Sequence, residues 1–151
     1  MPKSWRSGRV ASYMQYLLQD PAANAGVYNG FASGLEFSNG KPKATYDAYR
    51  LAVYMPRTSL TRSTNAEVWG NARPAPFMKK DGGGNQFVSI QLNGRTIRKQ
   101  RVNDGFFDLH MKFPRSGTVR LAYTYPKHDS FLPVTSLSKT VYSRSFRVNV
   151  R

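Results

Sequence analysis

The sequence predicts a mainly β protein, an immunoglobulin- or fibronectin-like β-sandwich of about seven strands, preceded by a segment of a different kind. Two observations predict the sandwich. Four segments after residue 85 alternate apolar and polar residues with a period of two, and turn-forming residues recur every ~8–12 positions between them. Residues 1–50 lack this pattern, so we expect a first region at 1–50 and the sandwich at 51–151.

The four alternating segments are expected to be half-buried antiparallel strands, because alternate side chains of a strand point to opposite faces of its sheet. They are Gln86–Leu92, Gly105–Phe113, Thr118–Tyr125 and Ser145–Arg151. In the second of them Phe107, Leu109, Met111 and Phe113 would face the core, and Asp108, His110 and Lys112 the solvent.

Three weaker segments complete the sandwich, at Leu51–Met55, Ala66–Trp69 and Arg95–Val102. Arg95–Val102 has many charges and few apolar residues, which is typical of an edge strand that resists aggregation. Asn93-Gly94 before it predicts a tight hairpin. Gly82–Gly84 is expected to be a hairpin loop, and Trp69 a residue of the sandwich core.

The first fifty residues contain two expected elements. The apolar residues of Val10–Leu18 fall at helical spacing, while the short length and the Asp20-Pro21 ending favour a buried strand. Asn39–Pro42 predicts a turn, and Lys43–Arg50 a short helix. Two elements and a loop cannot enclose a core, so this region must pack on another structure.

The composition is strongly basic, with 23 Lys and Arg against 8 Asp and Glu and a net charge of +15 over 151 residues. Such a surface attracts polyanions, although the scattered cations favour nucleic acid only weakly. The absence of Cys excludes disulfides and thiolate metal sites. No segment reaches membrane-spanning length, and no signal peptide follows Met1, so a genuine start at Met1 would imply a cytoplasmic chain.

Four segments resemble, in order, the end of a known enzyme fold. RVASYMQYLLQDP at residues 9–21 resembles the last barrel strand of secreted bacterial (β/α)8-barrel glycoside hydrolases of the cellulase-like and xylosidase-like families. FASGLEFSNGKPK at residues 31–43 and YDAYR at residues 46–50 resemble the segments that follow it. VWGNARP at residues 68–74 resembles the entrance to the β-sandwich of several such enzymes.

This resemblance implies that residues 1–50 are a remnant of the last βα unit of a barrel, with Val10–Leu18 a strand. Residues 51–151 would be an accessory sandwich that braces the barrel or contacts carbohydrate, in a secreted protein. Enzymes of this family use two glutamates, at the ends of the fourth and seventh barrel strands. The sequence has only Glu36 and Glu67, neither in the catalytic motif, so the resemblance implies no catalytic residue and no activity of the chain alone.

Two groups of residues are candidate sites. Gln19 and Asp20 would lie at the C-terminal end of the last barrel strand, where active sites form, and Tyr16 could stack on a sugar. In the structural interpretation, Asp20 caps a turn and Tyr16 belongs to a core. The candidates for polyanion contact are Arg95, Arg98, Lys99 and Arg101, within a wider basic face that includes Lys112, Arg120 and Arg147.

Two functions remain open. The first is the C-terminal part of a glycoside hydrolase, whose partner is carbohydrate through the parent enzyme. The alternative is a self-contained basic module that binds acidic glycans or, less expectedly, nucleic acid. We expect no cofactor and no metal, because His110 and His128 lie on separate elements.

Overall fold

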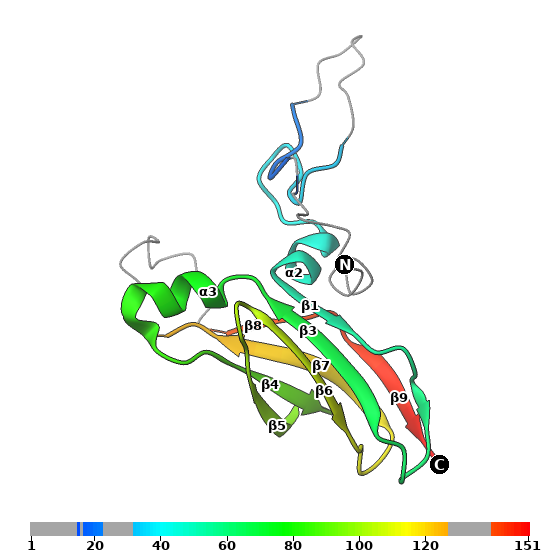
Figure 1. Cartoon of the computed structure of the whole chain (residues 1–151). Coiled ribbons are helices and arrows are strands. Elements are labelled where there is room, and N and C mark those ends of the chain that lie inside the picture. The colour runs from blue at the N-terminus through cyan, green and yellow to red at the C-terminus, as the bar shows by residue number, and fades with distance from the viewer. Residues whose placement is uncertain (1–14, 16, 23–31, 127–139) are drawn as a thin grey trace, which may run out of the picture. The chain divides into compact units, whose positions relative to one another are not determined.

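The computed structural model describes residues 15, 17–22, 32–126 and 140–151 (Figure 1). The chain divides into two compact units, Met1–Tyr49 and Arg50–Arg151, which are described separately. The candidate residue Tyr16 lies outside the described residues, as does most of the segment Val10–Leu18 that was expected to be a helix or a strand.

The second unit is a β-sandwich of two sheets, which confirms the predicted mainly β fold (Figure 1). In its described part, one sheet has the strand order β1-β3-β6, and the other has the order β2-β9-β7-β4-β5 with β8 also paired to β7. All pairs are antiparallel except β2 with β9. The strands are β1 (Leu51–Tyr54), β2 (Ser59–Leu60), β3 (Ala66–Ala72), β4 (Phe87–Leu92), β5 (Arg95–Arg101), β6 (Phe106–Met111), β7 (Gly117–Thr124), β8 (Thr140–Tyr142) and β9 (Phe146–Val150).

All seven predicted strands are present, with ends that differ from the prediction by a few residues. Strands β2 and β8 were not predicted. They contain only two and three residues, too few for an alternating pattern to stand out from the sequence.

The two sheets enclose one hydrophobic core, built from the alternating apolar positions of their strands. The residues expected to point inward are buried in β4, β6 and β7, and their neighbours Asp108, His110 and Thr118 are exposed. Residues from both sheets form this core, among them Val53, Val68, Phe107, Ile90, Leu121 and Val148.

The hairpin predicted at Asn93-Gly94 joins β4 to β5. Asn93 has a φ of 50° and Gly94 a φ of 78°, the left-handed values that a two-residue type I′ turn requires. Strand β5 is the last strand of its sheet, as predicted for Arg95–Val102, and it carries exposed charges along its length.

The glycine-rich segment is not the hairpin loop that was predicted. It ends a helical connection between the two sheets: α3 (Ala75–Met78) continues into one π-helical turn, η1 (Lys79–Gly83), before β4 begins. Prolines at the start of α3 are already set to a helical φ, and Gly82 and Gly84 have φ of 83° and 66° at its end. A hairpin is impossible here because β3 and β4 belong to different sheets.

Trp69 is buried, as predicted, but it lies on the outer face of the three-stranded sheet rather than between the sheets. Its neighbours in β3, Val68 and Gly70, face the core, so Trp69 faces the other way. There its ring lies 6.0 Å from the ring of Phe106, centroid to centroid, and only 1% of the residue is exposed.

Candidate functional site

The Asp20 carboxylate, one of the predicted carbohydrate contacts, is the centre of a polar cluster in the first unit. Its Oδ1 atom accepts the backbone N–H of Gly34 at 2.9 Å, and both its oxygens contact Lys43 Nζ, at 2.9 and 2.7 Å. The Asp20 and Lys43 side chains are only 11% and 17% exposed. Asp20 therefore joins two segments that are distant in the sequence, rather than capping the turn at Pro21.

Lys43 completes this cluster. It directly precedes helix α2 (Ala44–Arg50), which matches the predicted helix. Its ammonium group also donates to the carbonyl of Ala32 at 2.9 Å, and it lies 5.4 Å from the centre of the Phe37 ring. The turn before it has the predicted position, and Gly40 there has a left-handed φ of 75°. Sequence analysis missed Lys43, because nothing local links it to Asp20.

Gly34 is required at its position because the chain comes close to itself there. A Cβ atom at Gly34 would lie 2.6 Å from the backbone nitrogen of Asp20 and 2.7 Å from the carbonyl carbon of Gln19. Both distances are shorter than real Cβ contacts, so a larger residue would separate the two segments. Backbone hydrogen bonds between Leu18, Asp20 and Glu36 hold the same pair of segments together, at 2.8 and 3.0 Å.

Gln19, the second predicted carbohydrate contact, is exposed. Its backbone forms a parallel bridge with Glu36, and its side-chain Nε2 donates to the carbonyl of Ser38 at 2.6 Å. Its side chain is therefore held against the turn that leads to Lys43. The structure brings Gln19 and Asp20 together with Gly34 and Lys43, and a role in sugar binding stays a prediction.

The Asp20 cluster is expected to weaken at acid pH. The hydrogen bond from Lys43, helped by that from Gly34, lowers the pKa of Asp20 below its ordinary value of 3.8. A carboxyl whose folded-state pKa is lowered stabilises the fold fully above its ordinary pKa, and this contribution is lost as pH falls through the lower folded-state value. We expect the NMR amide resonance of Gly34 to titrate with a midpoint below 3.8.

The substitution Asp20→Asn should abolish this titration, whereas Asp47→Asn, at an exposed position of α2, should leave it unchanged. A Gly34 midpoint at or above 3.8, or a titration that persists in Asp20→Asn, would contradict the expectation.

The predicted basic face is divided among three surfaces of the sandwich. Lys99 and Arg101 of β5 pair with Ser89 and Phe87, whose side chains point away from the core, so these cations lie on the outer face of the six-stranded sheet. Arg120 of β7 and Arg147 of β9 share this face, since they alternate with buried residues.

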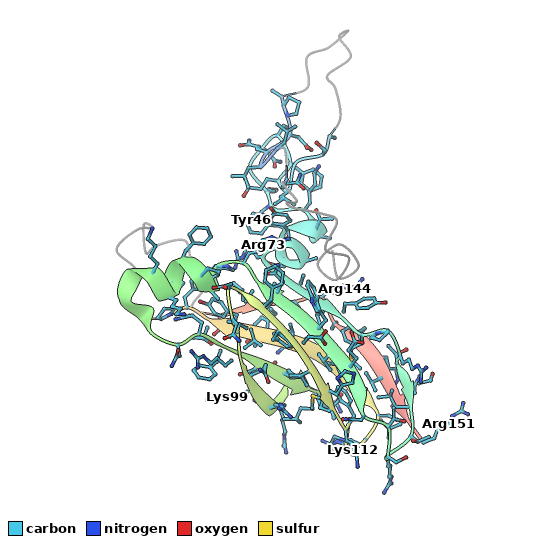
Figure 2. All side chains as sticks on the ribbon, in the orientation of Figure 1. Tyr46, Arg73, Lys99, Lys112, Arg144 and Arg151 are labelled. Atoms are coloured by element: carbon cyan, nitrogen blue, oxygen red, sulfur yellow. The ribbon has the colours of Figure 1, made fainter. Side chains whose placement is uncertain are left out.

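Arg95, Arg98 and Lys112 lie elsewhere, which corrects the prediction of one basic face. Arg95 and Arg98 pair with the core residues Leu92 and Ile90, and therefore lie on the opposite side of β5. A β-bulge between Ile90 and Gln91 reverses the alternation, so that Arg95 no longer shares a face with Lys99. Lys112 follows β6 in the other sheet, and Figure 2 shows it well apart from Lys99.

Arg120 is the most firmly held cation of the outer face. Its Nε donates to Gln91 Oε1 at 2.8 Å, and its guanidinium carbon lies 3.9 Å from the centre of the Tyr142 ring. Gln91 is the register partner of Arg120, and Tyr142 pairs with Ala122, two residues along β7. Sequence analysis missed Tyr142 because β8 is so short.

The described residues contain no group of three His, Asp or Glu side chains that could hold a metal ion. Glu36 lies in the first unit and Glu67 on β3 of the second. In the part of the chain that the structure describes, no helix is both long and apolar enough to cross a membrane.

No protein-family model and no curated protein matches the sequence. The structure is similar to β-glucuronidase of Bacteroides uniformis, with a TM-score of 0.39 and 14% identity over 80% of this chain and 14% of that chain. A calcium-binding mutant of β-glucuronidase 2 from the same organism gives a TM-score of 0.37 and 13% identity over 89% of this chain and 15% of that one. The chain thus spans about a seventh of the solved structures it matches, and a likeness this distant carries no conclusion about activity.

Proposed function

We propose that this chain is the C-terminal part of a glycoside hydrolase. Residues 1–50 would supply the last βα unit of its barrel, and the sandwich at 51–151 would brace that barrel or contact carbohydrate. The chain would not be catalytic alone, since its two glutamates lie outside the catalytic motif of the family it resembles. The whole enzyme would cleave O-glycosyl bonds and be secreted.

The contact of Asp20 with Gly34 and Lys43 is the observation that supports this proposal most. Asp20 ends the motif that resembles the last barrel strand, and Gly34 and Lys43 belong to the motif that resembles the next segment. A hydrogen bond and an ion pair join the two motifs. The contact gives a physical reason for Asp20, Gly34 and Lys43 to occur in one chain. It therefore argues against a chance resemblance of two unrelated motifs.

The described residues of the first unit bury little of their surface. Among its described residues only Gly34 and Leu35 are buried, helix α2 has no buried residue, and Leu18 and Phe37 are 60% and 50% exposed. In the proposed enzyme, these two exposed side chains would pack against another part of the protein. A missing barrel would provide that part.

Limited proteolysis with mass spectrometry tests whether the first unit is independent of the sandwich. We expect chymotrypsin to remove the first 49 residues and to leave a resistant fragment that begins near Arg50, where the two units meet in the sequence. Survival of the whole chain as one resistant body would contradict the proposal and favour the self-contained basic module.

The reading frame upstream of Met1 provides the second test. The proposal expects it to continue into a barrel with a glutamate at the ends of its fourth and seventh strands, and the joined polypeptide to hydrolyse aryl glycosides. A stop codon in frame close to Met1, with a functional start at that methionine, would refute it.

A further inference from the structure

We propose that the outer face of the six-stranded sheet binds an acidic polysaccharide through its carboxylates, with Arg120 as the central contact. Lys99, Arg101 and Arg147 would flank Arg120, and Phe87 would contact the apolar side of a sugar ring. This inference depends only on the sandwich, and it would stand if the chain were not part of a hydrolase.

The charges of the described strands are separated completely between the two sheets. The strands of the six-stranded sheet contain six Lys or Arg residues and no Asp or Glu. The strands of the three-stranded sheet contain two acidic residues, Glu67 and Asp108, and no Lys or Arg. A surface that merely kept the domain soluble would mix the two signs. Four of the six cations, Lys99, Arg101, Arg120 and Arg147, lie on the outer face, and the strands of this sheet contribute no acidic residue to it, so the face is complementary to a polyanion.

Arg120 is held in a conformation suited to a planar anion. Gln91 holds its Nε and the Tyr142 ring lies against its guanidinium group, so less side-chain entropy is left to lose when a ligand binds. In the described part of the chain no carboxylate forms an ion pair with it. Its two terminal nitrogens can therefore donate a parallel pair of hydrogen bonds to a carboxylate.

The aromatic residues favour a sugar polymer over a nucleic acid. Phe87 is 49% exposed and pairs with Arg101 on the outer face, which places an apolar ring next to a cation. Arg120 already occupies one face of the Tyr142 ring. Among the described residues of this face, Phe87 is the most exposed ring, and Tyr142 is 40% exposed but covered on one side by Arg120, so they form no row of open rings on which successive bases could stack. A single ring beside cations suits a pyranose that carries a carboxylate.

Affinity electrophoresis of the full chain tests this inference, with polygalacturonate as the acidic probe and dextran and poly(dT) as comparisons. We expect polygalacturonate to retard the chain more than either comparison, and the retardation to weaken with salt as the charges are screened. Arg120→Ala should weaken binding about tenfold, because it removes a charge-assisted bidentate contact.

Arg98→Ala is the matched control, since it removes the same charge from the opposite side of β5. We expect it to weaken binding by no more than about twofold, as a distant charge does in salt. Arg120→Lys keeps the charge but loses the planar fork, so it should bind nearly as weakly as Arg120→Ala. Thermal melting of each variant establishes that it is folded.

Three results would overturn the proposal: no retardation by polygalacturonate, equal loss in Arg98→Ala and Arg120→Ala, or tighter binding of poly(dT). Full binding by Arg120→Lys would also overturn it, because a point charge would then suffice and the fixed guanidinium group would have no role. None of these outcomes bears on whether a barrel precedes the sandwich.

Discussion

Replacing Gly70 with alanine is expected to lower the free energy of unfolding by about 3 kcal/mol, near the upper end of the range for overpacked cores. Gly70 lies in the middle of β3 and faces the core. A Cβ atom there would overlap the ring of Phe107 and lie 2.9 Å from Leu121 Cδ1. Alanine normally gains about 0.5–1 kcal/mol over glycine within a strand, so the steric cost must exceed that gain. Chemical denaturation monitored by tryptophan fluorescence measures the loss.

A double-mutant cycle identifies the cause of this loss. Phe107→Leu alone should destabilise the sandwich by about 1 kcal/mol because it removes buried apolar volume. In the double variant the smaller side chain makes room for the new methyl group, so the total loss should fall below the sum of the two single losses by more than about 1 kcal/mol. Strict additivity of the two losses, or an unchanged denaturation midpoint for Gly70→Ala, would show that overlap with Phe107 does not cause the loss of stability.

Replacing Gln86 with alanine is expected to cost about 2–3 kcal/mol, because it leaves the buried Tyr123 hydroxyl and the half-buried carbonyl of Gly83 without these partners. Gln86 is 5% exposed and accepts a hydrogen bond of 2.6 Å from the Tyr123 hydroxyl. Its Nε2 donates to the carbonyls of Gly83 and Gly84, at 2.8 and 3.1 Å. The side chain thereby ties the glycine-rich end of the helical connection to the central strand β7. Denaturation midpoints of the variant and the wild type measure the cost.

Tyr123→Phe is the control, since it removes one hydroxyl and leaves both carbonyls satisfied. Its cost should be about 1–1.5 kcal/mol. Burial, followed by the nearby Tyr125, raises the pKa of Tyr123, so the wild type should lose stability as pH rises above the ordinary value of 10.0. Tyr123→Phe should lose less over the same range. A Gln86→Ala variant no less stable than Tyr123→Phe would show that the carbonyl contacts contribute nothing.

The sequence by itself was sufficient to predict the seven longer strands. In β4, β6 and β7 large apolar residues recur at every second position, and this period of two predicts which side chains a strand buries without reference to any other segment. Asn93-Gly94 predicted its turn equally well, because the left-handed φ values it adopts are a local preference of those two residues. The many charges of β5 likewise predicted an edge strand, because an edge needs protection wherever it lies.

The candidate sites were predictable only as lists of residues. The basic residues were identified, but alternation places Arg98 on the side of β5 opposite to Lys99 and Arg101, and the bulge at Ile90 and Gln91 decided that Arg95 lies there too. The stacking of Arg120 on Tyr142 depends on the pairing of β7 with β8, whose sequences are about twenty residues apart in the chain and carry no mutual signal. Asp20 was identified as a candidate site, but its partner Lys43 was not.

The sequence alone therefore determined the fold class, the seven longer strands and the hairpin, because each follows from interactions between residues a few positions apart. The tertiary structure decided the features that require two distant segments to meet. The close approach of Phe107 explains why position 70 is glycine. The packing of the two sheets leaves Trp69 buried but outside the core between them. The tertiary structure also decided that Gly82–Gly84 ends a helical turn, because the chain there must pass from one sheet to the other. Register, packing and ion pairs of this kind depend on the relative positions of distant segments, which no local pattern records.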